Sequence, residues 1–244
     1  GYEAGRDQVI LSRKQGEEPY RRTPDVKDAV LDCRETEDFF VISGKDFRYV
    51  FDRFEGTFTS LAREGVLVTD QPVRLNLWRA PMDNDRNIRI EWEKAGYNRM
   101  QTKVLECSME KETDGRGAVC KAQITVRLQL VASWVQPIFA GRVIWSVRGR
   151  VEGDRETAMP FLPRFGLRLF LPKEFDRTRY LGYGPMESYC DKHQAARFGN
   201  FGASCQELYE PYLKPQENGS RWGCGYVELS GGDGRWLRAS AVGN

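Results

Sequence analysis

The fold class follows from Ala122-Gln123-Ile124-Thr125-Val126-Arg127-Leu128-Gln129-Leu130, in which every even position is apolar and every odd position is polar. Successive side chains of a β-strand point to opposite faces of a sheet, so this alternation is typical of a strand with one buried face. We therefore predict a strand over residues 122–130 whose even positions face a core.

The same period recurs on both sides of this stretch. Later along the chain, two sets of apolar residues alternate with polar ones: Val143, Trp145, Val147 and Val151, and then Phe165, Leu167, Leu169 and Leu171. Earlier, four short runs are aromatic or β-branched and are separated by glycine and charged turn residues: 39–42, 47–52, 57–62 and 73–78. All of these segments are predicted strands.

One segment has helical spacing. Ile88, Trp92 and Ala95 recur at that spacing, and Gly96 stands where a C-terminal cap is expected. Strands at intervals of about ten residues, without a regular alternation of strands and helices, favour an antiparallel sandwich or barrel. A TIM barrel is excluded for this segment, since it requires that alternation.

Composition limits the partners of the chain. Its 244 residues suffice for one large domain or two small ones, and 37 Lys and Arg against 35 Asp and Glu give a net charge of +2. This balance predicts that neither nucleic acid nor an anionic membrane is a partner. No stretch reaches the roughly 20 apolar residues of a membrane span. Six scattered cysteines without a CxxC pair, and one histidine, predict reduced thiols in a cytoplasmic protein and no soft-metal site.

The two ends of the chain predict a piece of a longer protein. The sequence begins with Gly1 rather than Met, reads at once like the middle of a domain, and ends just after an apolar run. Residues 1–12 contain one candidate strand, and residues 15–28 are charged and interrupted by proline, as in a linker.

Three loop-like segments are dense in polar groups: 79–85, 182–189 and 215–221. In the first, Asp83, Asn84 and Asp85 offer oxygen ligands for a hard cation. A calcium loop needs further ligands and a closing carboxylate, which the sequence does not provide. Turn and cap roles are therefore favoured for these residues.

Glu187 and Glu217 are the best loop-borne pair for retaining glycosidase chemistry, which needs two carboxyl groups about 5 Å apart. The alternative, which we favour, is that both are buried acceptors of backbone N–H groups at loop corners, paired with Arg79 or Arg221. His193 with a glutamate could instead provide the acid and base of sugar-ring opening. A lone histidine is more often a surface residue.

Arginines lie on the polar side of the alternating strands, at Arg127, Arg142, Arg148, Arg150, Arg164 and Arg168. They could form a basic face, but nearby carboxylates favour a solvated or salt-bridged one. Most aromatic residues are expected in the core, whereas Tyr189 and Trp222 could stack on a sugar ring. The sequence has no nucleophile elbow, P-loop or dinucleotide fingerprint.

Three motifs follow one another along the chain: 77–85 (LWRAPMDND) with 91–97 (EWEKAGY), 181–189 (LGYGPMESY) with Asp191, and 209–212 (YEPY) with 215–219 (PQENG) and Arg221. In this order they resemble the C-terminal domain of the large bacterial β-galactosidases of glycoside hydrolase family 2, the region called the β-galactosidase small chain. The resemblance spans about 39–229. Residues 1–12 are similar to the last strand of the immunoglobulin-like domain that precedes this region in the family.

The resemblance implies an all-β fold, an antiparallel β supersandwich related to the galactose mutarotases and truncated at its C-terminus. It implies that residues 1–14 are the last strand of a preceding immunoglobulin-like domain, 15–30 a linker, and 31–244 an incomplete small-chain domain.

The resemblance also implies that the active site lies elsewhere. The family's catalytic glutamates belong to a TIM-barrel domain further N-terminal, so Glu187 and Glu217 lose their claim as a glycosidase pair. The tryptophan by which this domain closes the family's galactose site lies beyond the end of this chain, because Trp236 is not in the matching motif.

The first functional hypothesis is therefore a structural part of a β-galactosidase. Its parent would hydrolyse terminal β-D-galactosides with retention, with Mg and Na ions held elsewhere and no cofactor in this segment. Its partners would be the catalytic barrel, the other domains and, in a homo-oligomer, a neighbouring subunit. A sheet edge left unpaired would favour self-association.

Two alternatives remain, an aldose epimerase that uses His193 and a galactoside-binding module. The binding set of that module would be Arg79, Asp83, Glu187, Tyr189, Glu217, Asn218 and Arg221.

Overall fold

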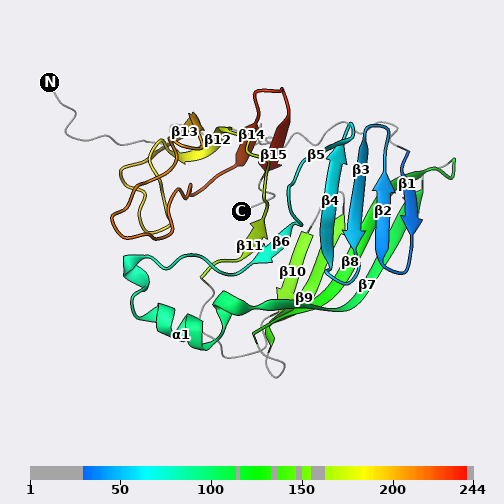
Figure 1. The fold of residues 1–244 in the computed structure, drawn as a ribbon, viewed down its shortest axis with the longest axis horizontal. Helices are drawn as coiled ribbons and strands as arrows, with labels where there is room; N and C mark the ends of the chain where they lie inside the picture. The colour runs from blue at the N-terminus through cyan, green and yellow to red at the C-terminus, as the bar shows by residue number, and fades with distance from the viewer. Residues whose placement is uncertain (1–29, 114–115, 133–136, 147–149, 155–162, 241–244) are drawn as a thin grey trace, which may run out of the picture. The chain divides into compact units, whose positions relative to one another are not determined.

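A computed structural model describes residues 30–113, 116–132, 137–146, 150–154 and 163–240 (Figure 1). The chain divides into two compact units, which are described separately. The sandwich unit is Val26–Pro172, and the C-terminal unit comprises Lys173–Asn244 together with Gly1–Asp25. The strand predicted in residues 1–14 lies outside the described residues, as does the predicted linker up to residue 29.

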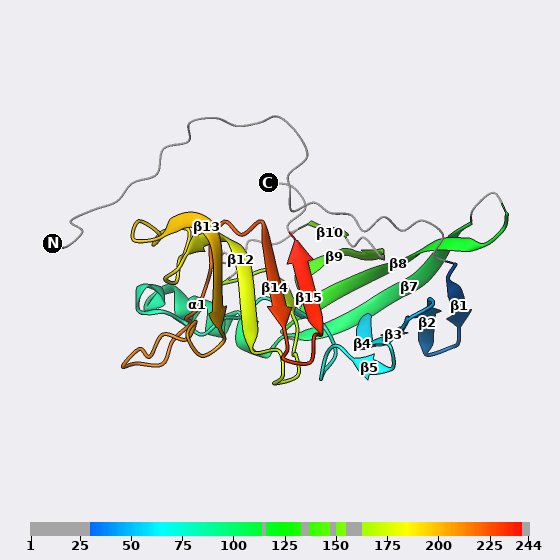
Figure 2. The same cartoon turned by 90° about the horizontal axis from the view of Figure 1, so that it is seen from above.

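The sandwich unit contains two large antiparallel sheets, seen as two layers in Figures 1 and 2. The first has the order β1-β2-β3-β4-β5, with bounds Asp32–Glu35, Phe39–Ser43, Phe47–Asp52, Thr57–Arg63 and Val66–Leu67. The second has the order β10-β9-β8-β7, with bounds Arg150–Asp154, Pro137–Ser146, Val119–Val131 and Gln101–Thr113. The prediction of an all-β antiparallel sandwich is confirmed.

The core of this unit lies between the two sheets. Phe40, Ile42 and Phe51 of the first sheet belong to one buried cluster with the even positions of β8, from Ala122 to Leu130. Those even positions are at most 1% exposed, so the predicted burial of this strand is confirmed. Rings of Phe51 and Phe58 meet Trp145 of the opposite sheet edge to face, at 6.3 and 5.5 Å between centroids.

The predicted helix is α1, Ile88–Lys94, between two short 3₁₀ helices, η1 (Asp83–Asp85) and η2 (Tyr97–Arg99). Trp92 is fully buried on its inner face. Gly96 follows the helix with φ of +81°, the left-handed conformation that glycine adopts at low cost. The predicted cap is therefore confirmed.

Two predicted strands differ from expectation. The run that includes Val143 and Val151 forms two strands, β9 and β10, which pair antiparallel with these two residues opposite each other. Near residues 165–171 only a short strand forms, β11 (Gly166–Arg168), which pairs with β6 (Arg74–Asn76) in a two-stranded sheet.

The expectation that the apolar residues of the second segment face a core is wrong. Phe165, Leu167 and Leu169 are 46%, 45% and 41% exposed. A two-stranded sheet offers too little area to bury a whole apolar face. Local alternation therefore predicted the strand but not whether another layer covers its apolar face.

Where the structure describes their side chains, the arginines on the polar side of the strands are solvated or salt-bridged, as expected. Arg127 of β8 lies 3.2 Å from Glu106 of β7, and both side chains are more than half exposed. Arg164 and Arg168 are exposed. The side chains of Arg142, Arg148 and Arg150 lie outside the described residues.

The C-terminal unit contains one four-stranded antiparallel sheet of order β13-β12-β14-β15, drawn from yellow to red in Figure 2. Its strands span Arg197–Ser204, Arg177–Gly184, Tyr226–Ser230 and Trp236–Ser240. Tyr180 of the inner strand β12 is 1% exposed. Within the described ranges, no helix has the length and apolar character needed to cross a membrane.

Replacing Leu130 by Ala should lower the free energy of unfolding by about 2–5 kcal/mol, because it opens a cavity between the two sheets. Leu130 is fully buried on β8. The control is Leu105→Ala on the neighbouring strand β7, where the side chain is 39% exposed and the loss should be well below 1 kcal/mol. Urea unfolding of both variants measures the difference, and equal losses would contradict the assigned core.

Candidate functional site

The predicted binding residues fall into two groups. Arg79 and Asp83 belong to the sandwich unit. The other five lie in the C-terminal unit: Glu187, Tyr189, Glu217, Asn218 and Arg221. Each group is therefore described with its own neighbours.

Arg79 and Asp85 form an ion pair that shapes the loop between β6 and α1. Nη1 of Arg79 lies 2.7 Å from one carboxylate oxygen of Asp85, and Nη2 donates to the other at 2.9 Å. Their side chains are 14% and 9% exposed. Such a two-point pairing of guanidinium and carboxylate fixes both distance and orientation.

Other contacts extend this pair to the surrounding chain. Nε of Arg79 donates to the Pro163 carbonyl at 3.0 Å, and its guanidinium lies over the Trp92 ring at 5.4 Å. The Met82 N–H donates to Asp85 at 2.8 Å, so the carboxylate also closes the turn before η1. This agrees with the turn role favoured for these residues, and Asp83 itself is exposed. In the described ranges, no three His, Cys, Asp or Glu residues form a group suited to a metal ion.

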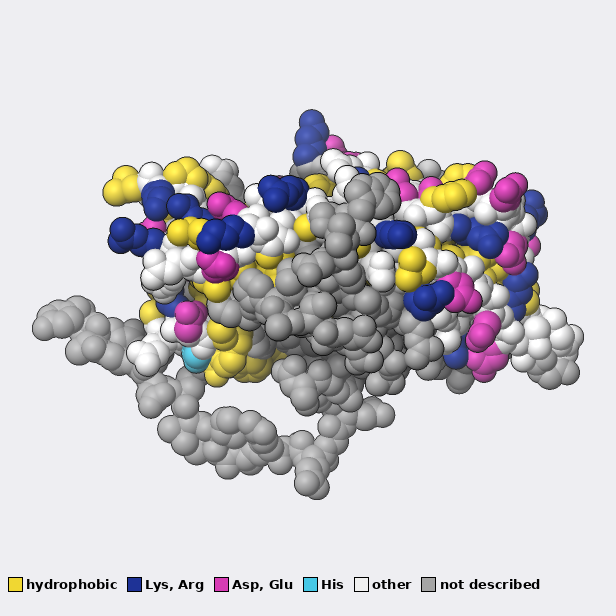
Figure 3. All heavy atoms as spheres, turned by 90° about the horizontal axis from the view of Figure 1, so that it is seen from below, with side chains coloured by type: hydrophobic (Ala, Val, Ile, Leu, Met, Phe, Trp, Pro, Cys, Tyr) yellow, Lys and Arg dark blue, Asp and Glu magenta, His cyan; other side chains and the backbone are white. Residues whose placement is uncertain are grey.

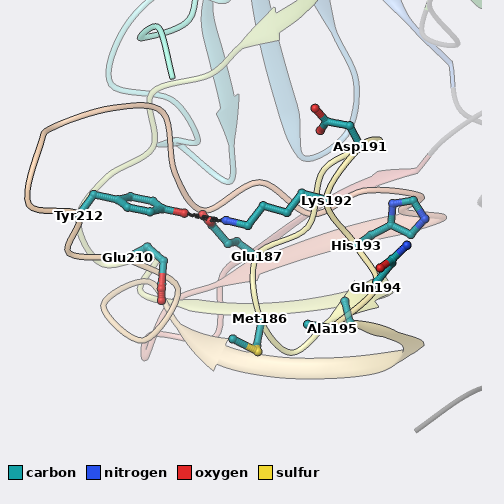
Figure 4. A pocket seen from close by; sticks show the side chains of 10 residues that line it. Met186, Glu187, Asp191, Lys192, His193, Gln194, Ala195, Glu210 and Tyr212 are labelled. Atoms are coloured by element: carbon teal, nitrogen blue, oxygen red, sulfur yellow. Dashed lines mark hydrogen bonds and ion pairs between the residues drawn. The ribbon is translucent and has the colours of Figure 1, made fainter. Parts of the chain in front are cut away.

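Glu187 is the centre of the loops in the C-terminal unit. It lies just after β12, and its side chain is 6% exposed. One carboxylate oxygen accepts hydrogen bonds from the Tyr212 hydroxyl and from Lys192 Nζ, the latter at 3.0 Å. Figure 4 shows both side chains pointing at this carboxylate. The other oxygen accepts from the Gly219 N–H at 3.1 Å and lies 3.5 Å from the Tyr189 hydroxyl.

These contacts join three loops at one carboxylate: the loop after β12, the segment around Tyr212, and the loop that contains Glu217. The Tyr189 hydroxyl completes the junction by donating to the Glu217 carbonyl at 3.3 Å. The arrangement agrees with the favoured interpretation of Glu187 as a buried acceptor of a backbone N–H. Its cationic partner is Lys192, however, and not Arg79 or Arg221.

Charge and hydrogen bonding fix the protonation states at this junction. Burial acts to raise the pKa of Glu187, but the hydrogen bonds from Tyr212, Lys192 and the Gly219 N–H outweigh it and lower that pKa. Hydrogen bonds to Tyr212 and Glu187 raise the pKa of Lys192. Burial, followed by the charges of Glu187 and Glu217, raises the pKa of Tyr189 to about 12.

This arrangement does not suit Glu187 as a general acid or Lys192 as a nucleophile. A general acid needs a raised carboxyl pKa, whereas that of Glu187 is lowered. A nucleophilic lysine needs a lowered pKa, whereas that of Lys192 is raised. Cys107 and Cys224 are poor nucleophiles near neutral pH, because burial raises the pKa of Cys107 to about 11 and also raises that of Cys224.

Arg221 and Ser188 connect the same loops a second time. Arg221 donates from Nε to the Tyr180 hydroxyl at 3.0 Å and from Nη2 to the Pro185 carbonyl at 3.3 Å. Ser188 is fully buried; its hydroxyl donates to the Tyr183 carbonyl at 3.0 Å and accepts from the Trp222 N–H at 2.9 Å. Most of the hydrogen-bonding capacity of these side chains is therefore used within the chain. The amide of Asn218 is half-buried and donates to the Gln216 carbonyl at 3.4 Å.

A cavity of about 360 Å³ lies beside this junction (Figure 4). It is lined by Met186, Glu187, Asp191, Lys192, His193, Gln194, Ala195, Ala196, Glu210 and Tyr212. The His193 ring stacks on Trp222 at 4.3 Å between centroids, and Nδ1 lies 2.9 Å from the Tyr189 carbonyl. Figure 3 shows this imidazole, the chain's single histidine, at the surface beside hydrophobic side chains.

Lys192 and Tyr212 were not among the site residues predicted from the sequence. Neither belongs to a recognisable catalytic pattern, and they lie 5 and 25 residues from the carboxylate that they bind. Tyr212 stands in the motif 209–212 noted above, but nothing in that motif indicates that its hydroxyl binds Glu187.

Comparison with known proteins identifies the family. The family model described as "Beta galactosidase small chain" matches residues 43–243. The chain belongs to the β-galactosidase small-chain family. The resemblance carried by the three motifs is thereby confirmed.

Relatives of this small-chain segment are β-galactosidases by name. The chain is 35% identical to the beta-galactosidase of Actinobacillus pleuropneumoniae over 79% of its own length and 19% of that protein. It is 32% identical to that of Staphylococcus xylosus over 95% of its length and 23% of that protein. It is 27% identical to that of Streptococcus thermophilus over 99% of its length and 23% of that protein. The chain thus spans about a fifth of each relative.

Breaking the buried ion pair between Arg79 and Asp85 should lower the stability of the fold. Arg79→Ala leaves the Asp85 carboxylate buried without its cation, which typically lowers the free energy of unfolding by about 3–5 kcal/mol. The control is Arg63→Ala, because Arg63 and its partner Asp46 are 58% and 45% exposed and such pairs contribute about 0–1 kcal/mol. Thermal or urea unfolding of the two variants compares the pairs, and similar losses would contradict the structural weight given to Arg79.

Glu187→Gln should change how stability depends on pH. A lowered carboxyl pKa stabilises the fold above the unfolded pKa of about 4.3, and this contribution disappears as pH falls through the folded pKa. The variant should therefore lose about 2 kcal/mol near pH 7, where hydrogen bonds to the charged group are lost, and much less near pH 3. Urea unfolding between pH 3 and 8 measures this. Glu174→Gln, at an exposed position of the same unit, should follow the parent curve; a pH-independent loss in Glu187→Gln would contradict the assignment.

Proposed function

We propose that the chain is a non-catalytic structural segment of a longer β-galactosidase. The proposal is carried by its membership of the small-chain family together with the small share, 19% and 23%, that it spans of two relatives named beta-galactosidase. The parent would hydrolyse terminal β-D-galactosides with retention, using two carboxyl groups outside this segment. Any Mg or Na ions would be held by other parts of the parent.

The state of Glu187 supports this structural role. Both of its oxygens already accept hydrogen bonds from within the chain, which favours a structural role over attack on an anomeric carbon or protonation of a leaving oxygen. The carboxylate instead holds three loops together. Arg79 and Asp85 have the equivalent role beside α1.

An exposed apolar row supports a contact with another part of the parent. Leu167 lies in the short strand β11, Phe165 precedes it and Leu169 follows it, and each is more than 40% exposed. Contiguous apolar surface of this kind is typical of a contact face. We propose that the rest of the parent, or a neighbouring subunit of a homo-oligomer, covers this row.

Galactoside binding by the second group of predicted residues stays a prediction. The cavity beside Lys192 and the ring of Trp222 would be its site. The internal use of Glu187 and Arg221 favours the structural role over direct contact with sugar hydroxyls. An epimerase that uses His193 is favoured still less, because its Nδ1 already lies against a backbone carbonyl and its ring against Trp222.

The purified 244-residue chain should show no turnover of a chromogenic β-galactoside above the buffer rate. The full-length parent serves as the positive control, and the chain carrying Glu187→Gln or Glu217→Gln serves as the matched negative. Turnover by the chain that either substitution abolishes would overturn the non-catalytic assignment. A full-length parent that is folded yet inactive on β-galactosides would instead overturn the activity proposed for the parent.

A further inference from the structure

A second cavity lies within the sandwich unit. It has a volume of about 630 Å³ and is bounded by residues of β4, β6, η2, β7, β8, β9, β11 and the turn between β3 and β4. Buried Val73, Tyr97 and Leu128 contribute to its wall, together with the half-buried rings of Trp78 and Trp145. Its size is that of a pocket for a small organic ligand.

Two arginines stand side by side at this cavity. Arg74 of β6 and Arg168 of β11 are direct cross-strand partners, so their side chains leave the same face of the two-stranded sheet about 5 Å apart at Cβ. Like charges placed opposite each other in this way destabilise a sheet. An anion bound between them would remove that repulsion.

The two arginines differ from others in the same unit. Arg34, Arg53, Arg63, Arg79 and Arg127 each form an ion pair with an Asp or Glu. Among the described residues, neither Arg74 nor Arg168 has such a carboxylate, and Arg168 lies only over the Phe170 ring, at 4.8 Å. The carboxylate among the lining residues is that of Glu55, on the exposed turn after β3, so the lining contains two cations and one anion.

The other residues that line the cavity indicate which kind of molecule would bear the anionic group. Tryptophan and tyrosine rings offer flat apolar surfaces on which a sugar ring can stack. Asn76, Asn98 and Gln101 place side-chain amides around the same cavity, and amides donate to and accept from hydroxyl groups. A guanidinium group binds the two oxygens of a carboxylate with two parallel hydrogen bonds, and a neutral sugar has no carboxylate.

We propose that this cavity binds a saccharide that carries a carboxylate, with Arg74 and Arg168 holding the carboxylate and the ring lying against the aromatic wall. The inference does not depend on the activity of the parent, because all of its residues lie within the sandwich unit.

Calorimetric titration of the 244-residue chain with D-galacturonate tests the proposal. The expected result is saturable binding that is at least tenfold tighter than that of D-galactose, which lacks the carboxylate, and of acetate, which lacks the ring. Binding should weaken as NaCl rises from low to high concentration, since ion pairing contributes to it. Tryptophan emission should change with the same midpoint, because two indoles line the cavity.

Arg74→Gln and Arg168→Gln should each weaken binding of galacturonate at least tenfold. Both variants should unfold at the same or a higher temperature than the parent chain, since each removes a like-charge neighbour. The control is Arg48→Gln, an exposed arginine of β3 outside the cavity, which should leave the dissociation constant within twofold.

Three results would overturn the proposal. The first is that galacturonate gives no heat and no change in emission. The second is that galactose or acetate binds as tightly as galacturonate, which would mean that carboxylate and ring are not recognised together. The third is that Arg48→Gln weakens binding as much as the two cavity variants do.

Discussion

The burial of one face of β8 is the constraint on which the sandwich unit depends. Its even positions are almost completely inaccessible, and they are covered because the sheet of β1 to β5 lies over them. β8 also pairs along most of its length with β7 and β9, so its backbone hydrogen bonds hold the second sheet together. Each role requires the other, since a central strand without a covering layer would expose a continuous apolar row to water.

The loops follow a different rule, which concerns charge. A carboxylate removed from water must be matched by donors or a cation. Asp85 obtains Arg79 and a backbone N–H, and Glu187 obtains Lys192, a tyrosine hydroxyl and a backbone N–H. These matched carboxylates give irregular segments a defined shape without strands or helices. That is why acidic residues in loops, which resemble catalytic groups in the sequence, can be structural.

The sequence predicted those parts of the structure that depend on neighbouring residues. Alternation located β8 and β9, aromatic or β-branched runs located β2, β3 and β4 of the first sheet, and the spacing of Ile88 and Trp92 located α1. It failed at Leu167, because alternation shows that a strand has an apolar face but not whether another layer covers it. The partner of Arg79 was also predicted wrongly, although Asp85 is only six residues away.

The residues of the candidate site were harder to predict than the strands, because some of their partners lie far apart in the sequence. Glu187 could be singled out from its loop, whereas Tyr212 lies 25 residues further along the chain and comes into contact only through the fold. Hydrogen bonding then decides the role of the carboxylate: the same residue type with one free oxygen and a raised pKa would have been a candidate acid.

The arginines of the sandwich unit differ in whether a carboxylate compensates their charge, and this difference distinguishes structural residues from binding residues. An arginine already paired with a carboxylate has its charge compensated inside the chain, as Arg79 has, and its removal is felt chiefly as lost stability. An arginine placed opposite another arginine, with no carboxylate partner among the described residues, costs stability in the unbound protein. Arg74 and Arg168 are of this second kind and open onto a cavity. Their mutual repulsion destabilises the unbound protein, whereas an anion between them would attract both guanidinium groups. These two residues are therefore better explained by binding than by stabilisation of the fold.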